Sequence, residues 1–270
     1  MRSYAAEVKA KGEQIGLVPT MGALHEGHLS LIRLAAAEND IVIVSDFVNP
    51  IQFDDPGDFS AYPKTPDVDA EASFSAGADV FFAPSADQMY PEGFSTYIDM
   101  TGISERLCGA SRSSHFRGVM TVVGKLFGIC MPDYAYFGEK DAQQLAIVKK
   151  MAADLCMNVS IRDCPTIREE DGLAMSSRNK RLTPDERIAA RCLYRALEEG
   201  YTLFINGEIS ADVLLAAMRG IIEAEPLARI DYVEIVDPMT FESVTGARKG
   251  DLMILAAYIG AVRLIDNRQF

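Results

Sequence analysis

Short apolar runs alternate with longer helix-like stretches over the first 165 residues of the chain. The run Ile41-Val42-Ile43-Val44 is continuous and β-branched, with no polar residue among its members. Runs of this kind are typical of strands that are covered on both faces in a parallel sheet. The pattern predicts strands at 15–18, 41–44, 79–84, 97–100, 134–137 and 159–161, and helices at 3–11, 29–37, 66–76, 116–130 and 142–151. This alternation indicates a doubly wound, Rossmann-like α/β fold with a parallel sheet.

The pattern changes after about residue 170. Thr183-Pro184-Asp185-Glu186 combines a capping threonine, a proline at the first helical position and a glutamate that completes a capping box, so a helix begins there. We expect this helix to run to about residue 204, a second helix at 210–224, and strands at 232–236, 252–257 and 262–265 without helices between them. Two helices followed by strands without intervening helices are typical of an α+β domain. The sequence therefore predicts a domain at 1–170 and a smaller one at 171–270.

Composition narrows the possible partners. The chain has 270 residues and a formal net charge of −13, which argues against a nucleic-acid backbone or an anionic membrane surface as a partner. We find no apolar run of membrane-spanning length and no secretory leader pattern. Five scattered cysteines suit reduced thiols, so a cytoplasmic location is expected.

The segment Pro19–His28 joins the first predicted strand to a helix. A strand, a turn of small residues and a helix start present backbone N–H groups and a positive dipole end to an anion. Gly22 and Gly27 allow close approach of the backbone to a ligand. His25 and His28 are three residues apart and share a helix face. They could be metal ligands or partly buried histidines, but we favour donors to phosphate oxygens; no protein metal site is predicted, because no third ligand with suitable spacing follows.

Further polar residues follow the ends of other predicted strands. Asn49–Gln52 comes after the second strand and Gly138–Asp141 after the strand at 134–137, so these segments and the histidine turn should converge at one edge of the sheet. Lys140 would begin a helix, where the dipole disfavours a cation unless an anion such as a polyphosphate is bound. Gln144 lies one turn after Lys140 on the same face, whereas we expect Gln143 to be solvated.

The segment Met175-Ser176-Ser177-Arg178-Asn179 has no apolar periodicity and combines two hydroxyls with an arginine. It is either a polar linker or a loop that binds phosphates through hydroxyl and guanidinium donors. Asp171-Gly172, just before it, is a turn signal. His115 remains open, because it could be functional, exposed or a helix cap.

Six blocks of the sequence occur together and in the same order in one known family. They are Pro19–His28 (PTMGALHEGH), Phe47–Phe53 (FVNPIQF), Tyr62–Thr65 (YPKT), His115–Val119 (HFRGV), Tyr136–Gln144 (YFGEKDAQQ) and Arg168–Asn179 (REEDGLAMSSRN). His-Glu-Gly-His is similar to the His-x-Gly-His signature of the nucleotidyltransferase superfamily. The whole set resembles the pantothenate synthetase (pantoate–β-alanine ligase) family.

The resemblance implies an ATP- and Mg²⁺-dependent, homodimeric enzyme that makes pantothenate through a pantoyl adenylate. Residues 1–170 would be the nucleotide- and pantoate-binding domain, and 171–270 a smaller C-terminal α+β lid domain. The ATP site would comprise Met21, Gly22, Ala23, Leu24, His25, Glu26, Gly27, His28, Gly138, Glu139, Lys140, Asp141, Ile167, Met175, Ser176, Ser177 and Arg178. Pantoate would be bound by Gln52 and Gln144, with Asn49 nearby. The catalytic group would be His25, His28, Lys140, Ser176, Ser177 and Arg178.

Asp46 is one of the departures from the family pattern, because it stands where an apolar residue is usual; its charge must be paired or near solvent. The loop at 54–58 and Ser113-Ser114 also differ from that pattern. Two other interpretations remain at this point. One is a different adenylyl-transferring enzyme of the same superfamily, and the other is a non-catalytic nucleotide-binding homologue. The intact Lys140, His28 and Arg178 argue against the second.

Overall fold

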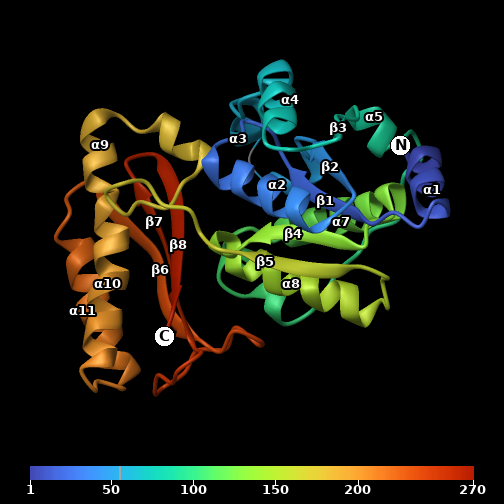
Figure 1. The fold of residues 1–270 in the computed structure, drawn as a ribbon. Coiled ribbons are helices and arrows are strands. Elements are labelled where there is room, and N and C mark those ends of the chain that lie inside the picture. The colour runs from blue at the N-terminus through green and yellow to red at the C-terminus, as the bar shows by residue number, and fades with distance from the viewer. Residues whose placement is uncertain (55) are drawn as a thin grey trace. The chain divides into compact units, whose positions relative to one another are not determined.

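Strands and helices alternate through the first part of the protein, as the apolar pattern predicts (Figure 1). The structure is a computed structural model that describes residues 1–54 and 56–270. Its elements up to residue 165 are α1 (Arg2–Ala10), β1 (Ile15–Thr20), α2 (Glu26–Glu38), β2 (Ile41–Asp46), η1 (Pro50–Gln52), α3 (Pro56–Ser60), α4 (Pro66–Ser75), β3 (Val80–Phe82), α5 (Ala86–Met89), η2 (Ile103–Glu105), α6 (Cys108–Ser111), α7 (His115–Cys130), β4 (Tyr134–Gly138), η3 (Glu139–Asp141), α8 (Ala142–Asp154) and β5 (Ser160–Cys164).

These five strands form one parallel sheet in the order β3-β2-β1-β4-β5. The connections to β2 and β3 cross the sheet in one direction and those to β4 and β5 in the other. Right-handed connections therefore place α2 and α4 on one face and α7 and α8 on the opposite face. The side chains of Leu17 in β1 and Ile43 in β2 are fully buried between these layers. The predicted doubly wound α/β fold is confirmed.

The strand expected at 97–100 is wrong. Residues 95–100 have no regular structure, and the Ile98 amide donates to Thr121 Oγ1 on α7 at 3.1 Å. The Tyr97 ring lies under the Arg117 guanidinium, 4.2 Å from the ring centroid. The alternation of apolar and polar residues in this segment thus reflects packing against a helix, which requires no strand partner.

The remaining elements are η4 (Ser177–Arg181), α9 (Pro184–Ala189), α10 (Arg191–Ile205), α11 (Ala211–Glu223), β6 (Ala228–Val236), β7 (Leu252–Ile259) and β8 (Val262–Gln269). The expected helix at 183–204 is divided into α9 and α10 at Ala190, although this residue keeps right-handed helical angles. Thr183 and Glu186 form the predicted capping box. No helix described within 1–54 and 56–270 has the length and apolar character needed to cross a membrane.

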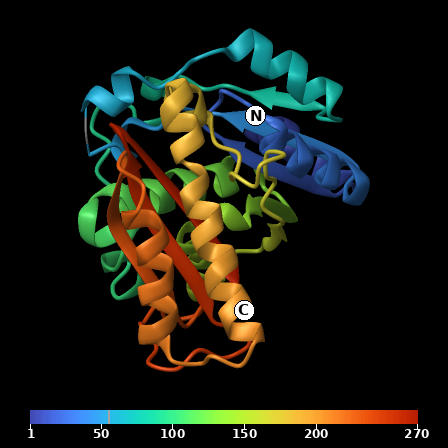
Figure 2. The same ribbon diagram turned by 90° about the vertical axis from the view of Figure 1, so that its left-hand side faces the viewer.

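The last three strands form an antiparallel sheet in the order β6-β7-β8. Helices α10 and α11 pack against each other and cover one face of this sheet (Figure 2). The core between them is built from aliphatic side chains, among them Leu197, Leu214 and Leu255, each with no exposed surface. This layer of two helices on an antiparallel sheet is the predicted α+β arrangement.

The chain forms two compact units. The first comprises residues 1–139 and 143–165, and the second comprises 140–142 and 166–270. The sequence pattern places the division at 170/171, five residues after this junction. Arg168 accounts for part of the difference, because its guanidinium pairs with Asp266 of β8 and so ties the residues before 171 to the second unit.

Candidate active site

The turn after β1 has a backbone that only small residues accept easily. Gly22 has φ +77°, and a Cβ at this position would lie 2.6 Å from Oδ1 of Asp46. Ala23 also has a positive φ, +52°. Thr20 fixes the start of the turn, because its hydroxyl donates to the Ser45 carbonyl at 2.8 Å and accepts from the Gly22 amide at 3.2 Å. The positive φ and the contact with Asp46 together require glycine at position 22.

Asp69 of α4 holds the same turn and was missed by the sequence analysis. Its carboxylate accepts the backbone amides of Ala23 (2.9 Å) and Leu24 (2.8 Å) and the Thr65 hydroxyl (2.9 Å), and the residue is buried. These two amides therefore already have a partner and are not among the free N–H groups that the turn was expected to offer to an anion. The sequence does contain one signal for this role: Asp69 is an acidic residue in the first turn of a predicted helix, four residues after the Tyr-Pro-Lys-Thr block.

His25 and His28 both serve as caps at the beginning of α2. Nδ1 of His25 accepts from the Gly27 amide at 3.1 Å, and Nδ1 of His28 accepts from the His25 amide at 3.4 Å. The two rings stack with their centroids 4.1 Å apart. Because Nδ1 is an acceptor in each ring, the neutral imidazole carries its proton on Nε2, where it can be donated to an acceptor oxygen.

Glu26 differs from the rest of this segment. Its carboxylate is exposed and pairs with Arg33 about two turns further along α2, with Nη1–Oε1 and Nη2–Oε2 distances of 2.5 and 3.1 Å. The hydrogen bond to Arg33 lowers the pKa of Glu26. The side chain is thus engaged on the surface of α2, and only its backbone belongs to the turn.

Asn49 and Gln52 are buried together beside Met21. The Asn49 amide donates to Gln52 Oε1 (2.9 Å) and to the Gly118 carbonyl (3.1 Å), and its oxygen accepts the Tyr90 hydroxyl (2.8 Å). Gln52 Nε2 donates to the Met21 sulfur at 2.7 Å. A thioether is a weak acceptor, so this amide gains by turning to a stronger acceptor when one is present. The histidine turn and the 49–52 segment therefore meet, as predicted.

The helix α7 packs closely on the 49–52 segment. A Cβ on Gly118 would lie 2.6 Å from Gln52 Cα, so glycine permits the contact. His115 is the first residue of α7, and its Nδ1 lies 2.9 Å from the Gln52 carbonyl oxygen. His115 is half-buried and Ser114 is the N-cap residue of α7, so His115 is neither exposed nor the cap; its ring contacts the backbone of the candidate pantoate segment.

Asp46 ends β2 directly beside Gly22. The side chain is half-buried, and burial, followed by the charge of Asp69, raises the pKa of the Asp46 carboxyl to about 6. A carboxylate in this position is therefore costly at neutral pH. Asp46 is partly exposed to solvent, which meets the expectation that its charge must be paired or near solvent.

The strand β4 ends next to β1 at the same edge of the sheet. The pairing Gly16↔Tyr134 and Leu17↔Ala135 extends to place Gly138 at the level of Thr20. Gly138 and Glu139 therefore follow the end of a strand that neighbours the histidine turn. Gln144, one turn into α8, is half-buried.

The expectation that Gln143 is solvated is wrong. Gln143 is buried, donates to the carbonyls of Ile103 (2.8 Å) and Arg106 (2.7 Å), and accepts from the Cys108 amide at 3.2 Å. The irregular 103–108 segment has no strand partner for these groups, so a side-chain amide satisfies them. Gln143 is a structural residue, and its neighbour Gln144 keeps the candidate role.

In the second unit, Lys140 has a partly buried side chain whose ammonium lies 3.7 Å from Asp141 Oδ1. Its carbonyl oxygen accepts the Asn267 side-chain amide at 2.8 Å. Lys140 stands in the 3₁₀ turn immediately before α8, as the sequence predicts. The position opposes the helix dipole, which is the reason for expecting an anion near this cation.

The segment from Ile167 to Met175 forms a short hairpin in the same unit. Met175 N donates to Ile167 O at 3.0 Å, and Arg168 and Ala174 form an antiparallel bridge. Gly172 in its turn has φ +90°, and a Cβ there would lie 2.1 Å from the Tyr194 ring. The turn predicted at Asp171-Gly172 is therefore present, and a side chain at position 172 would not fit.

Ser176, Ser177 and Arg178 follow this hairpin at the start of η4. The Ser176 hydroxyl accepts from the Arg178 amide at 3.3 Å, so it caps the 3₁₀ turn. Asn179 anchors the other side by donating to Glu169 Oε1 (2.9 Å) and the Ala174 carbonyl (3.1 Å). Two hydroxyls and a guanidinium are thereby collected in one short turn with a fixed base.

The described parts of the chain, 1–54 and 56–270, contain no group of three or more histidine, cysteine, aspartate or glutamate side chains that could hold a metal ion.

Comparison with known proteins assigns the family. The sequence profile described as pantoate-beta-alanine ligase matches residues 1–269. The chain belongs to the pantoate–β-alanine ligase family. A pantothenate synthetase from Carboxydothermus hydrogenoformans is 52% identical over 268 residues, which cover 99% of this chain and 95% of that protein.

Solved structures of the pantoate–β-alanine ligase family share the fold. A crystal structure of pantothenate synthetase from Thermus thermophilus superposes with a TM-score of 0.94 at 43% identity and covers 98% of this chain and 97% of its own. The Francisella tularensis pantoate–β-alanine ligase, solved as a complex with β,γ-ATP and β-alanine, has a TM-score of 0.81 at 37% identity and covers 98% and 94%. The resemblance inferred from the six sequence blocks is thus confirmed over the whole chain.

Proposed function

We propose that this protein condenses (R)-pantoate with β-alanine to pantothenate, with ATP cleaved to AMP and pyrophosphate. The observation that carries the proposal is the family match over residues 1–269. The Francisella relative, which was crystallised with an ATP compound and β-alanine, supports the same pair of substrates.

The first step transfers an adenylyl group to pantoate. A pantoate carboxylate oxygen attacks the α-phosphorus of ATP, the bond to the bridging oxygen breaks, and pyrophosphate leaves with the electron pair. A carboxylate is already ionised at neutral pH, so no general base is needed. In the second step the amine of β-alanine attacks the acyl carbon, loses a proton and displaces AMP.

The histidine turn would serve the phosphates in the first step. With Nδ1 of His25 and His28 accepting backbone amides, each ring offers an Nε2 proton. Both donors stand at the N-terminus of the thirteen-residue helix α2, whose dipole favours negative charge. Met21, Gly22, Ala23, Leu24, Glu26 and Gly27 would shape the nucleotide site mainly through their backbone.

Residues of the second unit would supply cationic and hydroxyl donors to phosphate oxygens of ATP. Lys140 stands before α8, and Ser176, Ser177 and Arg178 share the η4 turn. Charge-assisted hydrogen bonds from such groups strengthen as charge builds on phosphate oxygens, which lowers the barrier for adenylyl transfer. Gly138, Glu139, Asp141, Ile167 and Met175 would complete the nucleotide site.

Gln52, Gln144 and Asn49 would bind pantoate. Gln52 is buried and donates to a thioether, so a hydroxyl or carboxylate of the substrate would be a better acceptor. Neutral amides can hold a carboxylate nucleophile without the strong charge neutralisation that a cation would cause. Asn49 would act by fixing the Gln52 amide, to which it donates.

The Mg²⁺ ion that the family resemblance implies would enter with ATP. Mg²⁺ is usually held by substrate phosphates, water and one or two carboxylates. When bound, it would neutralise charge on the phosphates. Homodimerisation and a cytoplasmic location, which the family resemblance and the cysteine usage imply, stay predictions.

Isotope exchange tests the proposed reaction. If the adenylate forms first, labelled pyrophosphate should enter ATP in the presence of Mg²⁺ and pantoate with no β-alanine. Arg178→Ala should slow this exchange as well as overall synthesis, because Arg178 would act on the first step.

The two alternative functions predict other outcomes of the pyrophosphate exchange experiment. A different adenylyltransferase of the superfamily would exchange pyrophosphate without any dependence on pantoate, and a non-catalytic homologue would show no exchange. Exchange that appeared only after addition of β-alanine would exclude a free adenylate and favour a concerted condensation.

A further inference from the structure

The strand β8 carries a buried polar pair, Asp266 and Asn267, in a sheet whose other buried side chains are apolar. Successive residues of a strand point to opposite faces. Asp266 shares the face of Leu264, which belongs to the core under α10 and α11. Asn267 therefore projects from the other face, and the two side chains have different partners.

Asp266 pairs with Arg168 of the hairpin at 167–175. The guanidinium binds both carboxylate oxygens, with N–O distances of 2.6 and 3.0 Å, and the Asp266 side chain is 1% exposed. The same guanidinium donates to the Gly172 carbonyl (3.0 Å) and stacks on the Tyr194 ring, 4.9 Å from its centroid. A bidentate pair in this setting fixes both orientation and distance.

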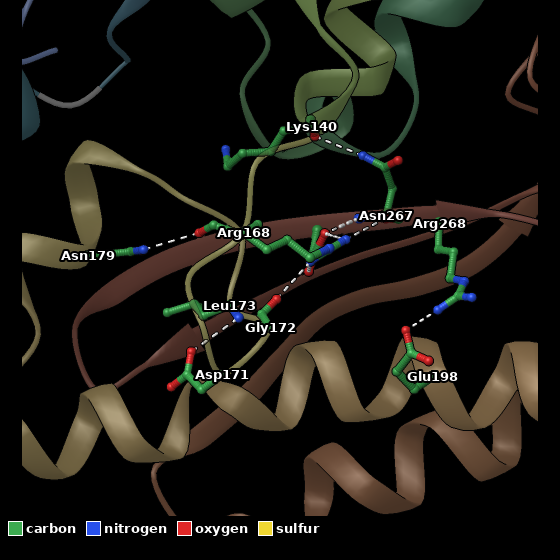
Figure 3. A network of polar contacts seen from close by, with 11 residues as sticks. Lys140, Arg168, Asp171, Gly172, Leu173, Asn179, Glu198, Asn267 and Arg268 are labelled. Atoms are coloured by element: carbon green, nitrogen blue, oxygen red, sulfur yellow. Dashed lines mark hydrogen bonds and ion pairs between the residues drawn. The ribbon is translucent and has the colours of Figure 1, made fainter. Parts of the chain in front are cut away.

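This pair also fixes the backbone of Asn267. The Asp266 carboxylate accepts the Asn267 amide at 2.8 Å, and Arg168 donates to the Asn267 carbonyl at 3.3 Å. The side chain of Asn267, which is 8% exposed, is then directed at the Lys140 carbonyl oxygen, to which it donates at 2.8 Å. Figure 3 shows the Lys140 side chain extending away from Asn267, so the hydrogen bond is made with the main chain.

We propose that Asn267 is a positioning residue for Lys140 and that the Arg168–Asp266 pair holds Asn267 in place. The proposal rests on the function proposed above, in which the Lys140 ammonium stabilises phosphate charge. A buried amide bound to the backbone of residue 140 sets where that side chain begins. A displacement of about 1 Å at such a position can cost on the order of a hundredfold in rate.

The test compares single and double variants by pyrophosphate exchange and by steady-state synthesis. Asn267→Leu removes the donor and keeps a side chain of similar size. We expect kcat to fall by about tenfold or more with little change in the KM for pantoate, because the lost interaction acts through the reacting phosphates.

Lys140→Ala provides the decisive background, because alanine keeps the carbonyl that Asn267 binds and removes only the ammonium. If Asn267 acts through Lys140, adding Asn267→Leu to Lys140→Ala should lower the rate by less than about twofold. A general structural role would instead multiply the two losses, and this result would overturn the proposal. Exchange by Asn267→Leu at the wild-type rate would overturn it as well.

Arg268→Met is the matched control on the same strand. Arg268 pairs with Glu198 and stacks on the Tyr201 ring at 3.8 Å, and neither contact involves Lys140. This variant should exchange pyrophosphate at the wild-type rate. Should Asn267→Leu melt early, Asn267→Ser, whose hydroxyl is too short to reach the carbonyl, should give the same pattern of rates.

Different experimental results would contradict the proposed function and the positioning role of Asn267. A wild-type protein that shows no pantoate-dependent exchange would overturn the proposed function and this inference with it. Normal wild-type exchange with a fully multiplicative double variant would overturn the inference alone.

Discussion

Asp46→Asn exchanges a half-buried carboxylate for a neutral amide of the same shape beside the histidine turn. Burial and the neighbouring Asp69 charge raise the pKa of Asp46 from an ordinary value of 3.8 to about 6. The folded protein thus holds a proton on this group more tightly than the unfolded chain does. The contribution of Asp46 to stability is therefore fully present below about pH 4 and is lost as the pH rises through about 6.

The size of the effect follows from the shift. A difference of about two pKa units, at about 1.4 kcal/mol per unit, corresponds to roughly 3 kcal/mol. Because the side chain retains contact with water, solvent screening reduces the expected value to about 1–2 kcal/mol. Asp46→Asn should therefore raise the free energy of unfolding by about 1–2 kcal/mol at pH 8 and leave it nearly unchanged at pH 4.

Urea unfolding of both proteins at several pH values between 4 and 8 measures this difference. Glu92→Gln, which neutralises an exposed carboxylate, controls for the change in net charge and should show no such pH dependence. A difference that is constant across the pH range, or an Asn variant less stable than the wild type at pH 8, would refute the burial argument.

Two further predictions concern the proposed reaction. His28→Ala and Lys140→Ala should each lower turnover by a factor of order a hundred, because both residues would stabilise charge that moves on the phosphates; a folded variant with near-normal turnover, as judged by circular dichroism, would exclude the role. Gln52→Ala should weaken pantoate binding by about 1–3 kcal/mol and raise the KM for pantoate far more than that for ATP, because a buried amide donor is lost. Equal changes in both KM values would show that Gln52 does not bind pantoate.

Most strands of the sheet could be predicted because they contain short apolar runs. Ile41–Val44 is an example, and it lies within β2 as expected. The pattern at 97–100 was equally suggestive, but its backbone amide is satisfied by Thr121, a side chain on a helix far along the chain. A local pattern carries no information about which distant group satisfies a backbone amide, and this limit produced the false strand.

The candidate site shows the same limit. The histidine turn was noticed because phosphate chemistry needs particular side chains at fixed spacing, and Gln52 was proposed because its block resembles that of the family. Asp69, Gln143 and Asn267 were missed, and each of them binds main-chain groups: the amides of 23 and 24, the carbonyls of 103 and 106, and the carbonyl of 140. Any residue offers such groups, so the partners leave no signature in the sequence.

The residues that were missed hold the backbone on which the candidate phosphate-binding residues stand. A turn with positive φ at Gly22 and Ala23 cannot rely on regular secondary structure to hold its amides, so a buried carboxylate does so. Lys140 likewise stands where a strand gives way to a helix, and its carbonyl is held by the Asn267 amide. Phosphate-binding residues lie at such junctions because free helix termini are there, and the junctions then require buried polar side chains to fix them. The candidate catalytic residues could therefore be proposed from sequence, whereas the residues that hold their backbone become visible only in the fold.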